Sequence, residues 1–147
     1  MAEIEVNEVS ELADLRLTKS EEEIMGLMWK ENRPLSRTEI IELLPERSWK
    51  KSSIHIFLNS MLEKDAIRVC GSIRTAKRFA RQFQPTVTPE QYTLIQLRQI
   101  PGFGKNSLVN ICRLLLEDVT EPEIYDQLGQ LFHKKLLELE ESETNCN

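Results

Sequence analysis

Four polar residues share one face of the helix that the hydrophobic pattern predicts for the stretch KKSSIHIFLNSMLEK, residues 50–64. They are Lys51, Ser52, His55 and Asn59, at positions i, i+1, i+4 and i+8. Hydroxyl, imidazole and amide groups form hydrogen bonds with the edges of bases in the major groove of DNA, and a lysine neutralises a phosphate. These residue types at this spacing are therefore typical of a surface that binds DNA.

The opposite face of the same helix is apolar, because its hydrophobic residues recur at helical spacing: Ile54, Phe57, Leu58, Met61 and Leu62. Lys50 and Lys51 lie in the first turn, where the positive end of the helix macrodipole disfavours cations. Contacts with phosphates would offset this cost, so both lysines are predicted to bind the DNA backbone. Ser53 and Ile56 flank the polar face, and Ile56 could contact a thymine methyl group.

The segment around this helix is basic although the whole chain is acidic. Residues 48–81 contain eight basic and two acidic residues, a formal charge of +6, whereas the chain as a whole carries −5. A basic segment in an acidic protein is typical of a protein that binds a polyanion. A solvated surface would carry the same charges, so the helical pattern is what favours DNA.

Two helices are predicted before this one. Thr18 caps the first, which ends near Asn32, and Ser36 caps the second, which ends near Pro45. Each capping residue is followed three positions later by a glutamate that completes a capping box. Ser48 is the predicted cap of the third helix, the one that carries the polar face.

A two-stranded hairpin is predicted after the third helix. Apolar and polar residues alternate in AIRVC, residues 66–70, and in KRFARQFQP, residues 77–85, as they do in strands. Three helices followed by a hairpin form a winged helix-turn-helix, in which the second and third helices read DNA. Arg74 and Lys77, near the tip of the hairpin, are predicted to contact the DNA backbone.

The C-terminal part of the chain is predicted to be a helical dimerisation domain. Its three helices, within residues 88–141, carry more apolar surface than an appendage could bury, and a symmetric dimer suits a helix-turn-helix that reads two half-sites. The residues expected at the dimer interface are Leu108, Val109, Cys112, Leu115, Ile124, Leu128, Leu131 and Phe132. A helical bundle that packs back on the first domain is the alternative.

The fold class expected is thus mainly α with a small β wing: an N-terminal winged helix-turn-helix and a C-terminal three-helix dimerisation domain. Residues 1–16 are expected to be a polar extension with no clear packing face. The DNA-binding domain is assigned to residues 17–87, the dimerisation domain to 88–141, and a tail to 142–147.

The composition argues against several classes of protein. No apolar run approaches the ~20 residues that cross a bilayer, and the acidic N-terminus lacks the pattern of a signal peptide, so a cytoplasmic protein without membrane insertion is expected. Cys70, Cys112 and Cys146 are widely spaced, which argues against a disulfide framework and a zinc site. No metal and no cofactor is expected. No Ser/His/Asp or Cys/His set is recognisable, so an enzyme is not expected.

Several stretches, taken in order, resemble the BlaI/MecI/CopY family of bacterial repressors, also called the penicillinase repressor family. Its first helix is similar to LTKSEEEIMGLMW, and its recognition helix to SWKKSSIHIFLNSMLEKDAI. The exit from its wing resembles FQPTVTPEQY, and its dimerisation segment resembles GFGKNSLVNICRLLLEDVTEPEIYDQLGQLF. The resemblance spans residues 17–139.

The resemblance implies a homodimeric transcriptional repressor that binds a palindromic operator. The branch that regulates β-lactam resistance, in which a membrane sensor-protease triggers cleavage of the repressor, is favoured by elimination, and another inducing signal is the open alternative. The copper-sensing branch instead binds metal through a C-terminal cluster of cysteines, and here only Cys146 lies near the end. The recognition helix departs from the family pattern, because Ser53, Ile56, Ser60 and Asp65 replace two threonines, an arginine and a terminal glycine.

Two other functions fit parts of the sequence. The segment LRQIPGFGKNSLVNI resembles a helix-hairpin-helix, in which Pro101, Gly102 and Gly104 would form a turn whose N–H groups bind a phosphate beside Lys105. The protein would then bind DNA without sequence preference. A winged helix also occurs as a protein-interaction adaptor, although a docking surface is more often apolar than rich in lysine.

Overall fold

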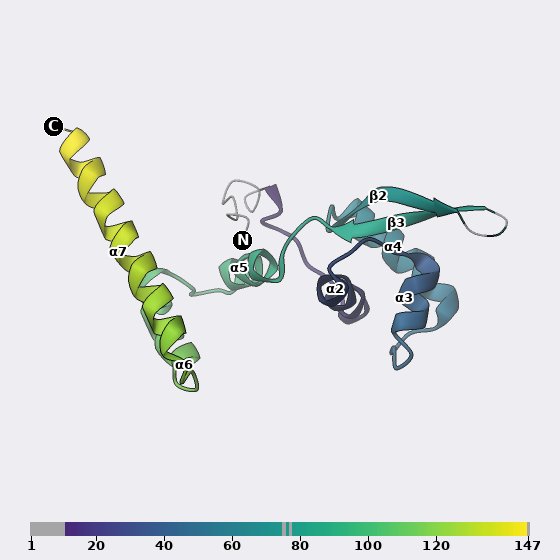
Figure 1. Cartoon of the computed structure of the whole chain (residues 1–147), viewed down its shortest axis with the longest axis horizontal. Helices are drawn as coiled ribbons and strands as arrows, with labels where there is room; N and C mark the ends of the chain where they lie inside the picture. Colours follow the sequence, from purple (N-terminus) through teal and green to yellow (C-terminus); the bar gives the residue numbers. More distant parts are fainter. Residues whose placement is uncertain (1–10, 75, 77, 147) are drawn as a thin grey trace. The chain divides into compact units, whose positions relative to one another are not determined.

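The computed structural model describes residues 11–74, 76 and 78–146, which fall into two compact units. The first unit ends at Phe103 and the second begins at Gly104. Figure 1 shows helices in both units and a small sheet in the first. The predicted fold class, mainly α with a small β wing on an N-terminal winged helix-turn-helix, is confirmed.

Helices α2 and α3 begin where their capping residues predict. Helix α2 spans Lys19–Glu31 and α3 spans Arg37–Leu43. Thr18 and Ser36 each close a capping box with the glutamate three residues later, so N–H groups of both first turns are satisfied locally. Helix α2 ends at Asn32, whose φ of 50° lies in the left-handed region that asparagine tolerates.

Helix α4 begins later than the sequence predicts. It spans Ile54–Glu63 and follows a 3₁₀ turn, η1, over Lys51–Ser53. The prediction that Ser48 caps this helix is wrong, because the N–H and hydroxyl of Ser48 donate to the carboxylate of Glu23 instead. Lys50 is the cap residue of η1 and forms no side-chain capping bond.

The sheet has the strand order β1-β3-β2. Strands β2 (Ile67–Arg74) and β3 (Phe79–Pro85) form the predicted antiparallel hairpin. Strand β1 (Leu35–Ser36) pairs with β3, with Leu35 opposite Phe83. The alternation of residues could not predict β1, because two residues are too short to alternate. This strand ties the start of α3 to the base of the wing.

The core of the first unit collects side chains from α2, β1, α3, α4 and α5. Among its largest fully buried side chains are Ile24, Met25, Met28, Leu35, Ile40, Met61 and Ile95. The ring of Trp49 lies edge-on to Phe57, with 5.6 Å between centroids, and the Arg47 guanidinium lies 5.5 Å from the Trp49 ring. These contacts fix the connection between α3 and α4.

Helix α5, which spans Pro89–Gln99, packs in the first unit. Thr88 caps it, as the sequence TPEQ with proline at the first helical position predicts. Tyr92 and Ile95 are buried in the same core as α2. The predicted domain boundary lies at residues 87/88, before this helix, whereas the first compact unit continues to Phe103.

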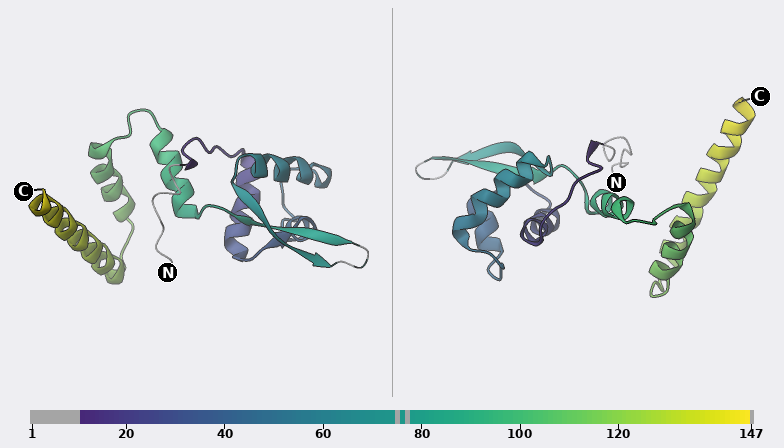
Figure 2. Two further views of the ribbon diagram at one scale, coloured as in Figure 1. Left: turned by 90° about the horizontal axis from the view of Figure 1, so that it is seen from above. Right: turned by 180° about the vertical axis from the view of Figure 1, so that it is seen from behind.

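The segment that precedes α2 also packs against this core. Leu15 is 5% exposed, and Leu12 and Leu17 pack beside it. Figure 2 shows this segment passing beside α5. The expectation that the extension lacks a packing face is therefore wrong for residues 12–16, while residues 1–10 lie outside the described part of the chain.

The second unit consists of helices α6 (Lys105–Leu116) and α7 (Pro122–Asn145). Thr120, with Glu123 three residues later, matches the pattern of a capping box and predicts the start of α7. This prediction is wrong, because Glu121 is the cap residue and its carboxylate accepts the Thr120 N–H at 3.0 Å. Helix α7 continues through most of the predicted tail to Asn145. Within the described ranges, no helix combines the length and the apolar character needed to cross a bilayer.

Candidate nucleic-acid interface

The predicted polar face of the α4 segment is exposed, and its apolar face is buried. Ile54, Leu58 and Met61 form the buried face and are at most 3% exposed. The predicted DNA-binding residues of this segment are exposed, apart from the half-buried Ser53: Lys50, Lys51, Ser52, His55, Ile56 and Asn59. Six side chains of the right chemical types are thus available to a ligand on one side of the unit.

The start of this segment is suited to an anion. Neither η1 nor α4 has an acidic residue in its first turn, and neither has a side-chain cap. The N–H of Ser53 donates to the Lys50 carbonyl at 2.9 Å, which begins the turn without a carboxylate. The positive end of the dipole and two exposed lysines therefore act together, which favours a phosphate at this position.

A hollow separates α3 from the beginning of α4. Its lining residues come from both helices and from η1: Arg37, Thr38, Ile41, Glu42, Lys51, Ser52, Ile54 and His55. The polar face is thus continuous with the exposed side of α3. The helix-turn-helix pair presents one joined surface.

A second hollow joins α4 to the wing. It is lined by Arg37, Thr38, His55, Leu58, Asn59, Arg78, Phe79, Ala80, Arg81 and Phe83. His55 and Asn59, which the sequence predicts as base-reading residues, therefore lie beside arginines from α3 and from the wing. Positively charged side chains around a polar strip can contact the DNA backbone and thereby position the polar side chains that bind base edges.

Some polar residues that line these hollows are not predicted from the sequence to contact DNA, among them Arg37, Thr38, Arg78 and Arg81. Arg78 and Arg81 add to the charge of the basic segment, but nothing in the sequence places them beside α4. Arg37 and Thr38 follow the capping residue of a helix, where polar residues are common. The pairing of β1 with β3 is the signal that would have placed α3 beside the wing.

The wing carries an exposed aromatic ring. Phe79 is 73% exposed and stands opposite Arg74 in the sheet register. The Arg81 guanidinium lies 5.6 Å from the Phe83 ring, which holds it against the base of the wing. Arg74, a predicted backbone contact, is exposed, and Lys77 lies outside the described residues.

A buried ion pair supports the other end of α4. Lys64 Nζ donates to Glu21 Oε2 at 2.7 Å, and the Glu21 side chain is 2% exposed. Burial alone would raise the pKa of the Glu21 carboxyl, but hydrogen bonds from Lys64, Ser60 and the Thr18 N–H outweigh it and hold that pKa below 4.5. Glu21 thus joins the start of α2 to the end of α4 as an ionised group.

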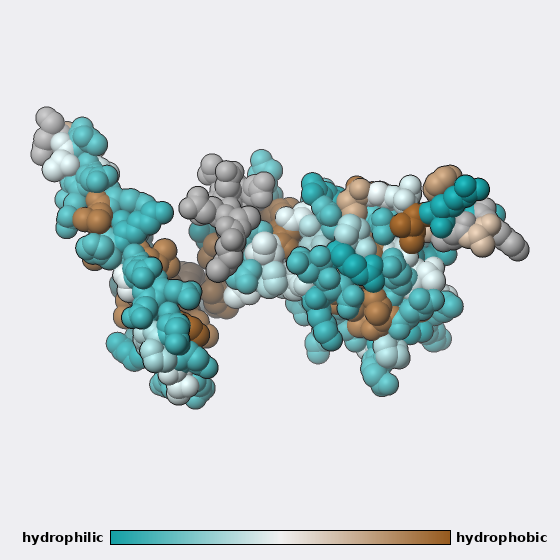
Figure 3. Space-filling model, in the orientation of Figure 1, coloured by the Kyte–Doolittle hydropathy of each residue, from teal (hydrophilic) through white to brown (hydrophobic). Residues whose placement is uncertain are grey.

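The helices of the second unit have no buried side chain. The residues predicted at a dimer interface include five that are more than half exposed: Leu108, Val109, Leu115, Leu131 and Phe132. Ile124 is 40% exposed, and Cys112 and Leu128 are partly buried. Figure 3 shows hydrophobic residues along α6 and α7. Large apolar side chains on both helices are thus exposed, and an exposed apolar patch often marks an interaction surface.

A model of the family described as "Penicillinase repressor" matches residues 17–102, more than half of the chain. This chain belongs to the penicillinase repressor family. The predicted family membership is therefore confirmed, and the chain is a DNA-binding repressor of the winged-helix type. No curated protein matches the chain.

The solved structures that match this chain include regulators from Staphylococcus aureus and Streptococcus pyogenes. MepR, a transcription regulator of the Staphylococcus aureus multidrug efflux pump MepA, is 16% identical, with a TM-score of 0.40 over 90% of this chain and 91% of that one. The adhesin competence repressor AdcR from Streptococcus pyogenes is 18% identical, with a TM-score of 0.39 over 89% of this chain and 91% of that one. The family assignment rests on the sequence match.

One residue of the turn after α4 has a left-handed backbone conformation. Asp65, which stands in place of a terminal glycine in the resemblance to the family pattern, has a φ of 55°. Glycine adopts this region freely, and aspartate is among the few other residues that tolerate it. Aspartate at this position is therefore compatible with the left-handed conformation of the turn.

The helix-hairpin-helix interpretation receives less support from the local geometry. Gly102 has a φ of 84°, as a tight turn requires. The N–H of Gly104 donates to the Ser107 hydroxyl at 3.3 Å, so one of the amides that would bind a phosphate already has a partner.

Among the described residues, no group of three or more histidine, cysteine or acidic side chains is arranged to hold a metal ion.

Proposed function

We propose that this member of the penicillinase repressor family binds a palindromic operator as a homodimer, with one α4 helix in the major groove of each half-site. The observation that carries this proposal is the exposed polar face of α4, bordered by cations from α3 and β3. On this proposal, His55 and Asn59 read bases, and Ile56 contacts a thymine methyl. Lys50, Lys51 and Arg74 contact phosphates, as does the neighbouring Lys77 of the wing.

The apolar surface of α6 and α7 is proposed to be the dimer interface. Two identical copies related by a two-fold axis would cover each other's exposed leucines, and the same axis would relate two half-sites of an operator. Association would also order helices that have no core of their own. This supports the dimer over a helical bundle within one chain.

The family resemblance supplies the proposed biological context. We infer that the repressor works in the bacterial cytoplasm on a resistance-type operon of the β-lactam branch. Release from DNA would then follow cleavage of the repressor after a membrane sensor-protease is activated.

The test is fluorescence anisotropy with the DNA upstream of the protein's own gene and a shuffled duplex of equal length. Binding that is tighter to the upstream DNA by about a thousandfold, at roughly physiological salt, would establish a sequence-specific regulator. Equal and salt-sensitive binding to both duplexes would favour a nonspecific DNA-binding protein. Absence of binding even at low salt would favour the protein-interaction adaptor.

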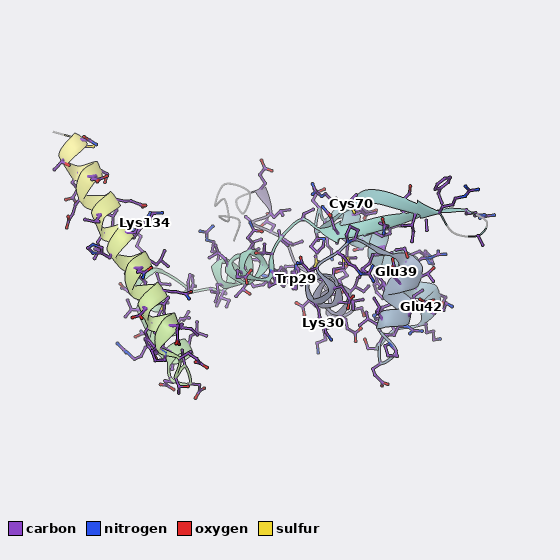
Figure 4. All side chains as sticks on the ribbon, viewed as in Figure 1. Trp29, Lys30, Glu39, Glu42, Cys70 and Lys134 are labelled. Carbon is purple, nitrogen blue, oxygen red and sulfur yellow. The ribbon has the colours of Figure 1, made fainter. Side chains whose placement is uncertain are left out.

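The variant Lys51→Ala is expected to weaken binding to every DNA sequence. Loss of one phosphate contact releases about one counterion fewer, so the slope of log affinity against log salt should become shallower by about one. Salt titrations with operator and shuffled duplexes measure both effects. Lys134→Ala, which removes an exposed lysine on α7, is the matched control (Figure 4).

The variant Asn59→Ala is expected to reduce specificity more than affinity for shuffled DNA. A lost contact with a base edge costs roughly 1–3 kcal/mol on the operator only. His55→Ala is expected to act in the same way. Competition between operator and shuffled duplexes measures the ratio of affinities. If both variants weakened the two duplexes equally, the assignment of these residues to bases would be wrong.

A further inference from the structure

The first half of α5 is held against α2 by an aromatic pair and a hydrogen bond. The rings of Trp29, on α2, and Tyr92, on α5, lie 5.8 Å apart, and Figure 4 labels Trp29. The Tyr92 hydroxyl donates to the Glu22 carboxylate at 2.9 Å. Burial and this carboxylate raise the pKa of Tyr92 to about 12, so the hydroxyl keeps its proton and remains a donor.

The second half of α5 is held by the segment that precedes α2, residues 12–17, which we call the strap. Gln96 Nε2 donates to the Leu15 carbonyl at 2.9 Å. Gln99 Nε2 donates to the carbonyls of Ala13 and Leu15 at 2.9 and 3.2 Å, and its Oε1 accepts from Arg16 Nε at 2.8 Å. Two glutamines one turn apart thus hold a single stretch of backbone.

Buried side chains also stabilise the contact between the strap and α5. Leu15, at the centre of the strap, is 5% exposed, and Ile95, beside Gln96, is 1% exposed. Leaving the Leu15 carbonyl without its donors would cost about 1–3 kcal/mol if it stayed away from water. Most of the strap lies before residue 17, where the match to the family model begins. The family pattern therefore does not account for this contact.

We propose that Gln96 and Gln99 are positioning residues for operator binding, because their grip on the strap fixes the end of α5 from which the chain continues toward α6. This inference rests on the proposed dimeric repressor. A fixed exit from the DNA-binding unit restricts the distances at which two such units in a dimer reach two half-sites. The strap would thereby select operators by the spacing between half-sites.

The expected size of the effect follows from chain geometry. A residue rises 1.5 Å in a helix, whereas it spans about 3.5 Å when extended. If the last four residues of α5 unwound, each protomer would gain roughly 8 Å of reach. This exceeds two base-pair steps of about 3.4 Å each, so the preference for one spacing should be lost.

The first test uses the double variant Gln96→Met with Gln99→Met, which keeps the side-chain length and removes the donors. Thr93→Ala, an exposed change on the same helix, is the control. Duplexes carry the two half-sites of the upstream operator with one to three base pairs added or removed. We expect the full-length native protein to lose about tenfold or more in affinity at two added base pairs, and the double variant less than about threefold.

The affinity for a duplex with one half-site should be the same for all three proteins. A merely structural role would weaken binding at every spacing alike, so a spacing profile that the double variant leaves unchanged overturns the proposal. A native protein with no preference among spacings also overturns it.

The second test is hydrogen exchange of the protein without DNA. In the double variant we expect faster exchange at residues 97–100, while α4 keeps its protection. Unchanged exchange at these residues overturns the proposal that the strap fixes the end of α5, even if the protein proves to be a dimeric repressor. Conversely, the double variant could show faster exchange although the native protein does not bind its upstream DNA. That result would support the contact between the strap and α5 and contradict the proposed function. Gln99→Met alone replaces the double variant if the latter does not fold.

Discussion

The variant Leu131→Glu is expected to be monomeric and to bind its operator more weakly by several orders of magnitude. Leu131 is 58% exposed on α7, in the surface proposed to be covered by a second copy. A carboxylate buried there would lack a partner, so the dimer would dissociate. Each protomer would then bind a single half-site and lose the roughly 10²–10⁴-fold gain of linked binding.

Sedimentation velocity measures the association state of this variant, and anisotropy measures its affinity. Gln130→Glu adds the same charge at the adjacent exposed position and is expected to remain a dimer. A monomeric Leu131→Glu protein that binds the operator as tightly as the native protein would remove the proposed role of the second unit.

The variant Lys64→Met is expected to lower the free energy of unfolding by about 2–3 kcal/mol. It leaves the buried Glu21 carboxylate without its cation. The estimate lies below the usual cost of breaking a buried pair because the Lys64 side chain is 32% exposed. Urea denaturation measures the loss. Lys135→Met removes an exposed pair with Glu138 and should change the stability by less than about 0.5 kcal/mol.

The stability lost in Lys64→Met should depend on pH. In the native protein the pKa of Glu21 is lower when folded than when unfolded, so its contribution is complete above pH 4.5 and declines as the pH falls through the folded pKa. The difference between native and variant proteins should therefore narrow in acid. A difference that stayed constant from pH 7 to about pH 3 would show that the pair is not ionised.

Local signals predicted most helix starts and the face of α4 that is buried. Capping boxes at Thr18 and Ser36 depend on residues three positions apart, so they can be found in the sequence. The buried face of α4 follows from helical periodicity alone. Ser48 failed as a cap because Glu23, 25 residues earlier, accepts its hydrogen bonds. A capping pattern involves only neighbouring residues, so it cannot predict an acceptor that lies far away in the sequence.

Long-range pairings account for the parts of the candidate interface that the sequence did not reveal. The two residues of β1 show no period, yet their pairing with β3 brings Arg37 beside the wing. The strap likewise shows no regular pattern. As a set, Leu12, Leu15 and Leu17 follow neither a helical nor an alternating pattern. The glutamines that donate to the Ala13 and Leu15 carbonyls lie more than 80 residues away in the sequence.

The absence of a core in the described second unit has a consequence for gene control. If α6 and α7 become ordered by association, functional repressor forms in proportion to the square of the protomer concentration below the dissociation constant of the dimer. Halving the amount of protein in the cell would then reduce the amount of dimer about fourfold. Dilution by growth, or slow degradation, would therefore lower the concentration of dimer, and with it the occupancy of the operator, more steeply than the total concentration of protein.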